Sequence, residues 1–352
     1  MLESSAIKTG ASLDEALARE AAGHPLSADL RCAIAALARA GAKISHAIRA
    51  YDASHGHAGG EAAVNADGDT QLGLDVIANE IVLAEISATP TAYFASEEED
   101  AVVSLDPAGT LAVAVDPLDG SSNVNANITI GTIFSVFAAV PGQATASFLR
   151  PGREQIAAGY LAYGPHTALV LTLGKGTHSF VLDDSSQSFR LAARDLAIPA
   201  TTREFAINAS NYRHWHPPVR AFIDDCLAGA EGPRGKEFNM RWVASLVAET
   251  HRIMMRGGAF LYPADARKGY ESGRLRHVYE AAPIAFVVEQ AGGRASDGHG
   301  PILDNVPAAL HVRTPLIFGS AEKVGRIESY HQDPGFARER SPLFRSRGLF
   351  NA

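Results

Sequence analysis

Apolar residues recur between residues 27 and 50 at alternating steps of four and three, with small or polar residues between them. The stripe consists of Leu30, Ile34, Leu37, Ile44 and Ile48, and Gly41 fills its one missing place. This period predicts an amphipathic helix, and Ser27 is expected to be its N-cap. Gly41 either weakens that helix or marks a close contact with a neighbouring element.

Short apolar runs of strand type, bounded by Gly, Pro, Asp and Ser, occupy much of the rest of the chain. They predict strands at 92–95, 111–115, 128–140, 158–163, 168–173, 179–182 and 259–262. Helical patterns at about 75–87, 243–255 and 282–290 interrupt them, and the last two end at glycine pairs. This mixture predicts an α/β protein, α+β in its layering, with alternating layers of helix and sheet.

The length of 352 residues suggests two domains. We expect a flexible N-terminal arm at 1–26, a first domain at 27–200, a second at 201–332 and an irregular tail at 333–352. The boundary near residue 200 is placed at the sequence Pro-Ala-Thr-Thr.

Composition and charge exclude several classes of protein. The net charge of -8 argues against a general nucleic-acid binder. Two cysteines are too few for a disulfide scaffold and suggest reduced thiols. Residues 1–25 lack the apolar segment of a secretory signal, and no run approaches the ~18 apolar residues of a membrane span. The expectation is a soluble, cytoplasmic protein without nucleic-acid or membrane partners.

The most informative segment is Asp-Pro-Leu-Asp-Gly-Ser-Ser-Asn at 116–123, directly after an apolar strand. Two carboxylates three residues apart can converge if the chain turns there, and Pro117 and Gly120 favour a turn. The Gly-Ser-Ser stretch offers backbone and hydroxyl donors that suit a phosphate. Carboxylates beside phosphate donors call for a cation between them, and Mg²⁺ binds carboxylate and phosphate oxygens.

Further acidic residues fit this chemistry less specifically. Glu97 and Glu98 follow an apolar strand, and Asp69 and Asp75 flank the start of a predicted helix. A single carboxylate is most often a surface charge, but Asp116 follows Ala-Val-Ala-Val and is expected near a buried sheet edge. Two other kinds of residue are not expected in the site: the surface charges Glu99 and Asp100, and the loop pairs His55/His57 and His214/His216, which lack the partners of a zinc site.

These motifs resemble those of class I fructose-1,6-bisphosphatases, within the group of Mg²⁺-dependent, lithium-sensitive sugar and inositol phosphatases. The resemblance runs from about residue 27 to residue 330. It is carried by the 116–123 motif, Ser-Glu-Glu at 96–98, Phe-Leu-Tyr-Pro at 260–263 and Gly-Arg-Leu-Arg-His-Val-Tyr-Glu at 273–280. It implies a sugar phosphatase fold, hydrolysis of the 1-phosphate of fructose 1,6-bisphosphate in gluconeogenesis or the Calvin cycle, and a homotetramer.

The resemblance also implies a role for each matching residue. Two to three Mg²⁺ ions, replaceable by Mn²⁺, would be held by Glu97, Asp116, Asp119, Glu280 and the Leu118 carbonyl, with Asp69 at a substrate-dependent metal site. Glu98, Asp75 and Asp69 would be catalytic, and Glu98 and Asp75 would orient and deprotonate the attacking water. The substrate would contact Asp119, Gly120, Ser121, Ser122, Asn208, Tyr212, Leu261, Tyr262 and Arg274, and Arg241 from a neighbouring subunit. The first domain would then carry the metal site and the second the substrate pocket.

Two residues depart from the family pattern at the distal phosphate. Arg274 stands where many members have Lys, and Trp242 stands where Tyr is usual. Three alternatives remain: a phosphatase for sedoheptulose 1,7-bisphosphate, alone or as a second substrate; an inositol monophosphatase; and a non-catalytic sugar-phosphate sensor. The Tyr262 segment and the Arg241/Arg274 pair argue against the second, and the intact acidic set argues against the third.

Overall fold

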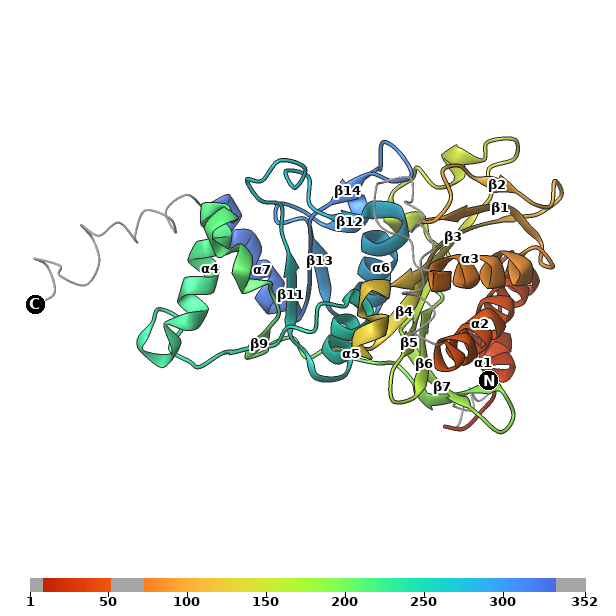
Figure 1. Ribbon diagram of the computed structural model, residues 1–352, viewed down its shortest axis with the longest axis horizontal. Coiled ribbons are helices and arrows are strands. Elements are labelled where there is room, and N and C mark those ends of the chain that lie inside the picture. The colour runs from red at the N-terminus through yellow and green to blue at the C-terminus, as the bar shows by residue number, and fades with distance from the viewer. Residues whose placement is uncertain (1–8, 52–72, 334–352) are drawn as a thin grey trace, which may run out of the picture.

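Helices and sheets alternate in five layers in the computed structural model, which describes residues 9–51 and 73–333 (Figure 1). The first layer holds α1 (Leu13–Glu20), α2 (Ser27–Ala50) and α3 (Gly73–Ile86). A large sheet, the pair α5 (Leu246–Arg256) and α6 (Ala282–Gln290), and a small sheet follow. The outer layer at the opposite end holds α4 (Pro217–Leu227) and α7 (Ala321–Gln332). The predicted layered α/β fold is confirmed.

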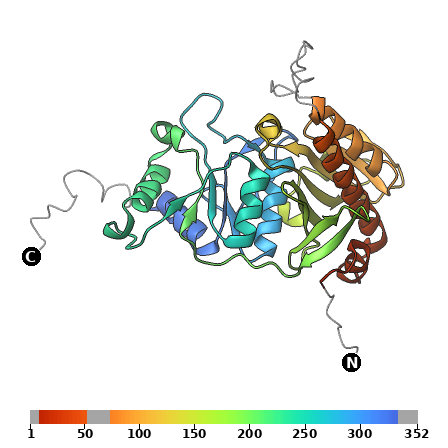
Figure 2. The same ribbon diagram turned by 60° about the horizontal axis from the view of Figure 1, so that its bottom comes forward.

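The large sheet has eight strands in the order β2-β1-β3-β4-β5-β6-β7-β8. β1 and β3 are parallel and all other pairs are antiparallel. The strands are β1 (Thr91–Ser96), β2 (Val103–Ser104), β3 (Leu111–Asp119), β4 (Ile130–Ala138), β5 (Ala157–Tyr163), β6 (Thr167–Thr172), β7 (His178–Asp183) and β8 (Ser188–Ala193). Every residue of β3 is buried, because helices cover both faces of the sheet. Figure 2 shows α2 and α3 on one face and α5 and α6 on the other.

The small sheet has the order β11-β15-β13, and two further strand pairs lie beside it. These strands are β11 (Ala259–Tyr262), β13 (Arg294–Ser296) and β15 (Leu316–Gly319), and the pairs are β9 (Glu204–Phe205) with β10 (Asn239–Met240) and β12 (Leu275–Arg276) with β14 (Arg313–Thr314). Short helical turns are η2 (Ser121–Ala126), η3 (Thr145–Ser147), η4 (Gly152–Glu154), η5 (Ala209–His214), η6 (Gly229–Glu231), the π-helical turn η7 (His277–Ala281) and η8 (Ile302–Asp304). One core cluster joins strands β4 to β6 to α5, α6 and the small sheet, so the two halves of the chain share a core.

Two predictions at the N-terminal side are wrong. Residues 13–20 form α1 rather than part of a flexible arm, with a capping box in which the Ser12 hydroxyl accepts from the Glu15 amide and the Glu15 carboxylate accepts from the Ser12 amide. The sequence Ser-x-x-Glu is the signature of that motif. Ser27 is the first residue of α2 and not its cap, which is Leu26 without a side-chain bond. Helices α4 and α7 were not predicted.

Gly41 lies in close contact with β5. A Cβ atom at this position would stand 2.1 Å from Cδ2 of Leu161, so the second of the two expectations for Gly41 is confirmed. We expect Gly41→Ala to lower the free energy of unfolding by about 1–3 kcal/mol, because an overpacked core must shift. The matched control is Gly325→Ala in α7, where the nearest atom is 3.8 Å away.

The control should raise the unfolding free energy by up to about 1 kcal/mol through helix propensity. Denaturant unfolding of both variants measures the two effects. Equal stability of the two variants would contradict the close contact of Gly41 with Leu161.

Among the described residues, no helix is long and apolar enough to cross a membrane.

Candidate active site

A bulge at the end of β3 brings two carboxylates to one face of the sheet. Residues three apart on a regular strand point to opposite faces. Here Asp116 opposes Ile133 and Asp119 opposes Gly131, so three steps on β3 match two on β4. The extra residue turns both carboxylates the same way. The Thr132 hydroxyl fixes the bulge by donating to the carbonyl of Pro117 at 2.8 Å.

A third carboxylate joins them from a distant part of the chain. Carboxylate oxygens of Asp116, Asp119 and Glu280 all lie within 4.8 Å of one another, and all three residues are buried. Glu280 belongs to the π-helical turn that leads into α6, a conformation frequent at functional sites. The Arg276 amide donates to its Oε2. This arrangement supplies several oxygen ligands around one point.

Glu97 completes the acidic cluster from the end of β1. Its amide donates to the Val115 carbonyl at 3.0 Å, which continues the pairing of β1 with β3 and places Glu97 beside Asp116. Its Oε1 accepts from Nη1 of Arg276. Its Oε2 is buried without a hydrogen-bond partner among the described residues. A buried carboxylate oxygen in this state is suited to a cation.

Burial raises the pKa values of the carboxylates in the cluster. Burial raises the pKa of Glu97 to about 7 and that of Asp119 to about 6. Burial, followed by repulsion from the neighbouring carboxylates, raises the pKa values of Asp116 and Glu280 well above their ordinary range. Arg276 offsets this in part. Buried carboxylates are difficult to ionise without a neighbouring positive charge, and their oxygen atoms are ligands that a hard divalent cation prefers. The cluster therefore suits such a cation.

Asp119 also faces the start of α5. Its Oδ2 accepts from the amide of Val247, in the first turn of that helix, at 2.8 Å. The N-cap is Ser245, whose hydroxyl accepts from the Ala248 amide. The helix N-terminus therefore favours negative charge at this point of the site.

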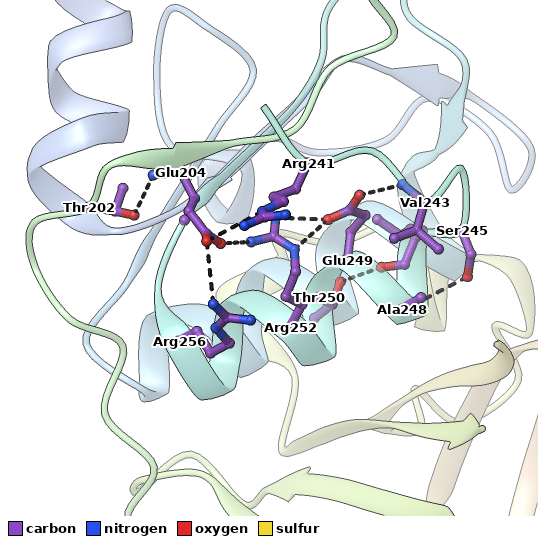
Figure 3. Close-up of polar contacts among 12 residues, drawn as sticks. Thr202, Glu204, Arg241, Val243, Ser245, Ala248, Glu249, Thr250, Arg252 and Arg256 are labelled. Atoms are coloured by element: carbon purple, nitrogen blue, oxygen red, sulfur yellow. Dashed lines mark hydrogen bonds and ion pairs between the residues drawn. The ribbon is translucent and has the colours of Figure 1, made fainter. Parts of the chain in front are cut away.

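A network that the sequence did not predict holds the segment before α5 (Figure 3). The buried Glu249 accepts from the Val243 amide at 2.7 Å and from Nη2 of Arg252 at 2.8 Å. Arg252 also donates to Glu204 of β9 at 2.7 Å. The Ala244 carbonyl accepts from the Asn123 side chain at 2.9 Å, which ties this segment to the 116–123 motif. Glu249 was missed because an acid inside a helix usually lies on its exposed face.

The predicted phosphate cradle lies between β3 and η2. Gly120 has φ of 76° and is the N-cap of η2, so its left-handed conformation favours glycine. Ser121 is half-buried and Ser122 is exposed, while Leu118 is buried in the bulge. Their predicted ligand roles remain predictions.

Four of the predicted substrate residues line one pocket. Asn208, Leu261, Tyr262 and Arg274 meet there with other side chains, among them Trp215 and Tyr270. Nη1 of Arg274 donates to the Tyr270 hydroxyl at 2.8 Å. Burial raises the pKa of Tyr262. The charge of Arg274 lowers that pKa and the charge of Glu280 raises it, so the pocket adjoins the acidic cluster at Tyr262.

Two neighbours fix the shape of this pocket. Gly273, with φ of 83°, lies so close to β14 that a Cβ would stand 2.3 Å from the Thr314 carbonyl carbon. This contact sets the position of Arg274. Trp242 stacks on Phe260 with ring centroids 5.9 Å apart and contacts Tyr262 at 6.2 Å. Trp242 therefore supports Tyr262 through ring contacts.

Two of the residues predicted for the sugar and 6-phosphate end of the substrate, Tyr212 and Arg241, do not line that pocket. The Tyr212 hydroxyl donates to Asp224 at 2.8 Å. Arg241 is half-exposed and lies 3.5 Å from Glu204 (Figure 3). The structure therefore places both outside the group formed by Asn208, Leu261, Tyr262 and Arg274.

Two further predicted residues, Asp75 and Glu98, lie near the ends of α3 and β1. Asp75 is buried in the first turn of α3, and Glu98 is half-buried just after β1. Asp69, His55 and His57 lie outside the described residues. Glu99, expected to be a surface charge, is half-buried and accepts from Nδ2 of Asn79 at 2.8 Å.

Asn79 also explains how β1 presents its acids. Its Oδ1 accepts from the buried Ser96 hydroxyl at 2.7 Å, and Ser96 in turn accepts from the Glu98 amide at 3.2 Å. These contacts fasten the acidic segment to α3. These contacts join residues of two separate elements, so no repeating pattern in the sequence predicts them.

Comparison with known proteins agrees with this geometry. Residues 13–194 match the family model described as fructose-1-6-bisphosphatase, N-terminal domain, and residues 198–332 match the C-terminal domain. The fructose-1,6-bisphosphatase class 1 of Paracoccus denitrificans is 56% identical over 92% of this chain and 96% of its own length. That of Rhodobacter capsulatus is 55% identical over 96% of this chain and 100% of its own.

Solved structures agree with the sequence comparisons. The holo form of Leishmania major fructose-1,6-bisphosphatase superposes with a TM-score of 0.84 at 32% identity, covering 93% of this chain and 100% of that one. The likeness therefore extends over both halves of the chain. The chain belongs to the class 1 fructose-1,6-bisphosphatase family and is an enzyme that hydrolyses fructose 1,6-bisphosphate.

Proposed function

We propose that the chain removes the 1-phosphate of fructose 1,6-bisphosphate, giving fructose 6-phosphate, with the help of two to three Mg²⁺ ions. The observation that carries this proposal is the buried group Asp116, Asp119 and Glu280, with oxygens within 4.8 Å of one another. Glu97, the Leu118 carbonyl and Asp69 would complete the ligand set, and Mn²⁺ would be a substitute. When bound, the cations would neutralise phosphate charge and polarise the phosphoryl group.

The residues of this chain have separate tasks around the 1-phosphate. Backbone and hydroxyl donors of Gly120, Ser121 and Ser122 bind the phosphate oxygens. Glu98 and Asp75 orient the attacking water and accept its proton. Phosphoryl transfer depends on such positioning and on charge stabilisation more than on covalent chemistry.

The other end of the substrate is held by the pocket of Asn208, Tyr262 and Arg274. Arg274 supplies the charge for the 6-phosphate, in a planar fork that can bind two oxygens. We further propose that Tyr212 contributes at the rim of this pocket and that Arg241 reaches the 6-phosphate of a neighbouring subunit in a homotetramer. The half-exposed position of Arg241 supports this role. The two free cysteines support a cytoplasmic location.

Phosphate release from fructose 1,6-bisphosphate, measured with Mg²⁺ and with EDTA, tests the metal requirement. Sedoheptulose 1,7-bisphosphate and inositol 1-phosphate serve as parallel substrates. We expect Mg²⁺-dependent release from fructose 1,6-bisphosphate at the highest kcat/KM and negligible release from inositol 1-phosphate, which lacks a second phosphate for Arg274. Full activity in EDTA would refute the metal proposal, and a higher kcat/KM for the seven-carbon substrate would reassign the specificity.

Metal binding should also change how stability depends on pH. The folded-state pKa values of Glu97 and Asp119, about 7 and about 6, lie above the ordinary values of 4.5 and 3.8. Their protonated forms thus stabilise the metal-free fold at low pH, and this contribution is lost as pH rises through about 6 to 7. Bound Mg²⁺ stabilises the ionised carboxylates, so the metal-loaded protein should not lose this stability as pH rises.

We therefore expect the difference in unfolding free energy between Mg²⁺-loaded and EDTA-treated protein to widen by about 1–3 kcal/mol between about pH 5.5 and about pH 8. Denaturant unfolding at the two pH values, with and without metal, measures it. A difference that stays constant or narrows would contradict the acidic cluster as the metal site.

A further inference from the structure

A second pocket is lined by residues of α7 and of the segments that precede β9 and β10. Figure 1 shows α7 in the outer layer, at the opposite end of the molecule from α1 to α3. The pocket has a volume of about 230 Å³ and is lined by Thr201, Thr202, Pro233, Arg234, Lys236, Glu322, Lys323 and Arg326. None of these residues lines the substrate pocket. Four of the eight are cations and one is an acid.

The cations of this pocket lack acidic partners among the described residues. Elsewhere in the described residues, Arg252 is paired with Glu249 and Arg153 with Asp304. Within residues 9–51 and 73–333, none of the four pocket cations forms an ion pair. In a chain with a net charge of -8, such a concentration of unpaired positive charge creates a local positive potential that attracts anions.

Lys323 is the buried member of the group, only 3% exposed. Its Nζ lies 3.5 Å from the ring centroid of Phe238 and 5.2 Å from that of Phe222. Its one hydrogen-bond partner among the described residues is the Cys226 thiol, a weak acceptor at 3.6 Å. Burial lowers the pKa of Lys323 to about 8, so the ammonium still carries its charge at neutral pH.

Arg234 shows the same lack of acceptors. Its guanidinium lies over the rings of Phe222 and Phe238. Its Nη1 is buried without a hydrogen-bond partner in the described part of the chain. Aromatic rings thus hold two cations in place without neutralising them. Arg326 is exposed and Lys236 is half-buried, and they add charge on the outer side.

We propose that this pocket is a second anion site, which binds phosphate or the phosphate group of a small phosphomonoester. The four cations and the carboxylate of Glu322 give the pocket a net charge of +3, which suits a phosphate dianion, and a planar guanidinium suits phosphate oxygens. The hydroxyls of Thr201 and Thr202 add polar groups. The lining segments lead directly into β9, which carries Glu204, and into β10, which precedes Arg241. A ligand here would therefore lie next to the segments that hold the Arg241–Glu204 ion pair.

Binding of radiolabelled orthophosphate to the Mg²⁺-loaded full chain, measured by equilibrium dialysis, tests the proposal. We expect two classes of site, one being the active site. The double variant Lys236→Gln/Arg326→Gln should weaken one class at least about tenfold, since charge-assisted contacts are lost. Both residues have some exposure, which favours folding of the variant. The matched control is Arg203→Gln, which removes an exposed cation beside the pocket that does not line it.

The control should keep both classes within about twofold. Competition by glycerol 3-phosphate at the sensitive class would assign it to a phosphomonoester, and absence of competition would assign it to free phosphate. A single class of site in the unaltered chain, or an equal loss in the control, would overturn the proposal. Unchanged kcat and KM of the double variant without added phosphate separate this outcome from damage to the active site.

Discussion

Replacement of Asp119 by Asn is expected to lower kcat at least ~100-fold, which corresponds to about 2.7 kcal/mol. Asparagine has nearly the same shape and its carbonyl oxygen can still accept from the Val247 amide, which lies 2.8 Å from Asp119. The fold around the start of α5 should therefore persist. What is lost is one negative charge from the group that Asp116, Asp119 and Glu280 form. Steady-state kinetics over a range of Mg²⁺ concentrations measures the effect.

Asp100→Asn is the matched control for this substitution. Asp100 belongs to the same acidic stretch as Glu97 but is exposed and lies outside the cluster. Its loss should change kcat less than about twofold. Near-normal turnover of Asp119→Asn at saturating Mg²⁺ would remove Asp119 from the metal site, whatever the control does.

Replacement of Arg274 by Ala is expected to raise KM for fructose 1,6-bisphosphate by about 10- to 150-fold, the equivalent of one charge-assisted contact of roughly 1.5–3 kcal/mol. The 6-phosphate does not react, so its binding energy should be nearly uniform between ground and transition states, and kcat should fall less than about threefold. The contact of Arg274 with Tyr270 should also be lost. Initial-rate measurements separate KM from kcat.

Two further variants make this result specific. Lys268→Ala removes an exposed cation from the same loop, outside the pocket, and should leave KM within about twofold. Arg274→Lys should keep most of the affinity, because a point charge still binds phosphate. An unchanged KM in Arg274→Ala would show that the distal phosphate is bound elsewhere.

Local patterns predicted much of the fold because they depend on neighbours in sequence. The stripe of Leu30 to Ile48 became α2, and the apolar run before Asp116 became the buried β3. The capping box at Ser12 was equally local, and α1 could have been predicted from it. Helices α4 and α7 pack against the small sheet through a core cluster of their own, which short-range patterns did not reveal.

The candidate active site also has features that the sequence predicted and features that it did not. The sequence alone determined which residue types were available: the carboxylates of 116–123, the Ser-Glu-Glu motif at 96–98 and the segment that ends in Glu280. Only the tertiary structure decided that a bulge turns Asp116 and Asp119 to one face, that Glu280 joins them from a π-helical turn, and that Arg276 contacts Glu97. It also decided that Glu249 is buried and that four cations meet beside α7. The physical reason is that these groups are distant in sequence, so their approach depends on strand register and on the packing of layers, neither of which has a local period.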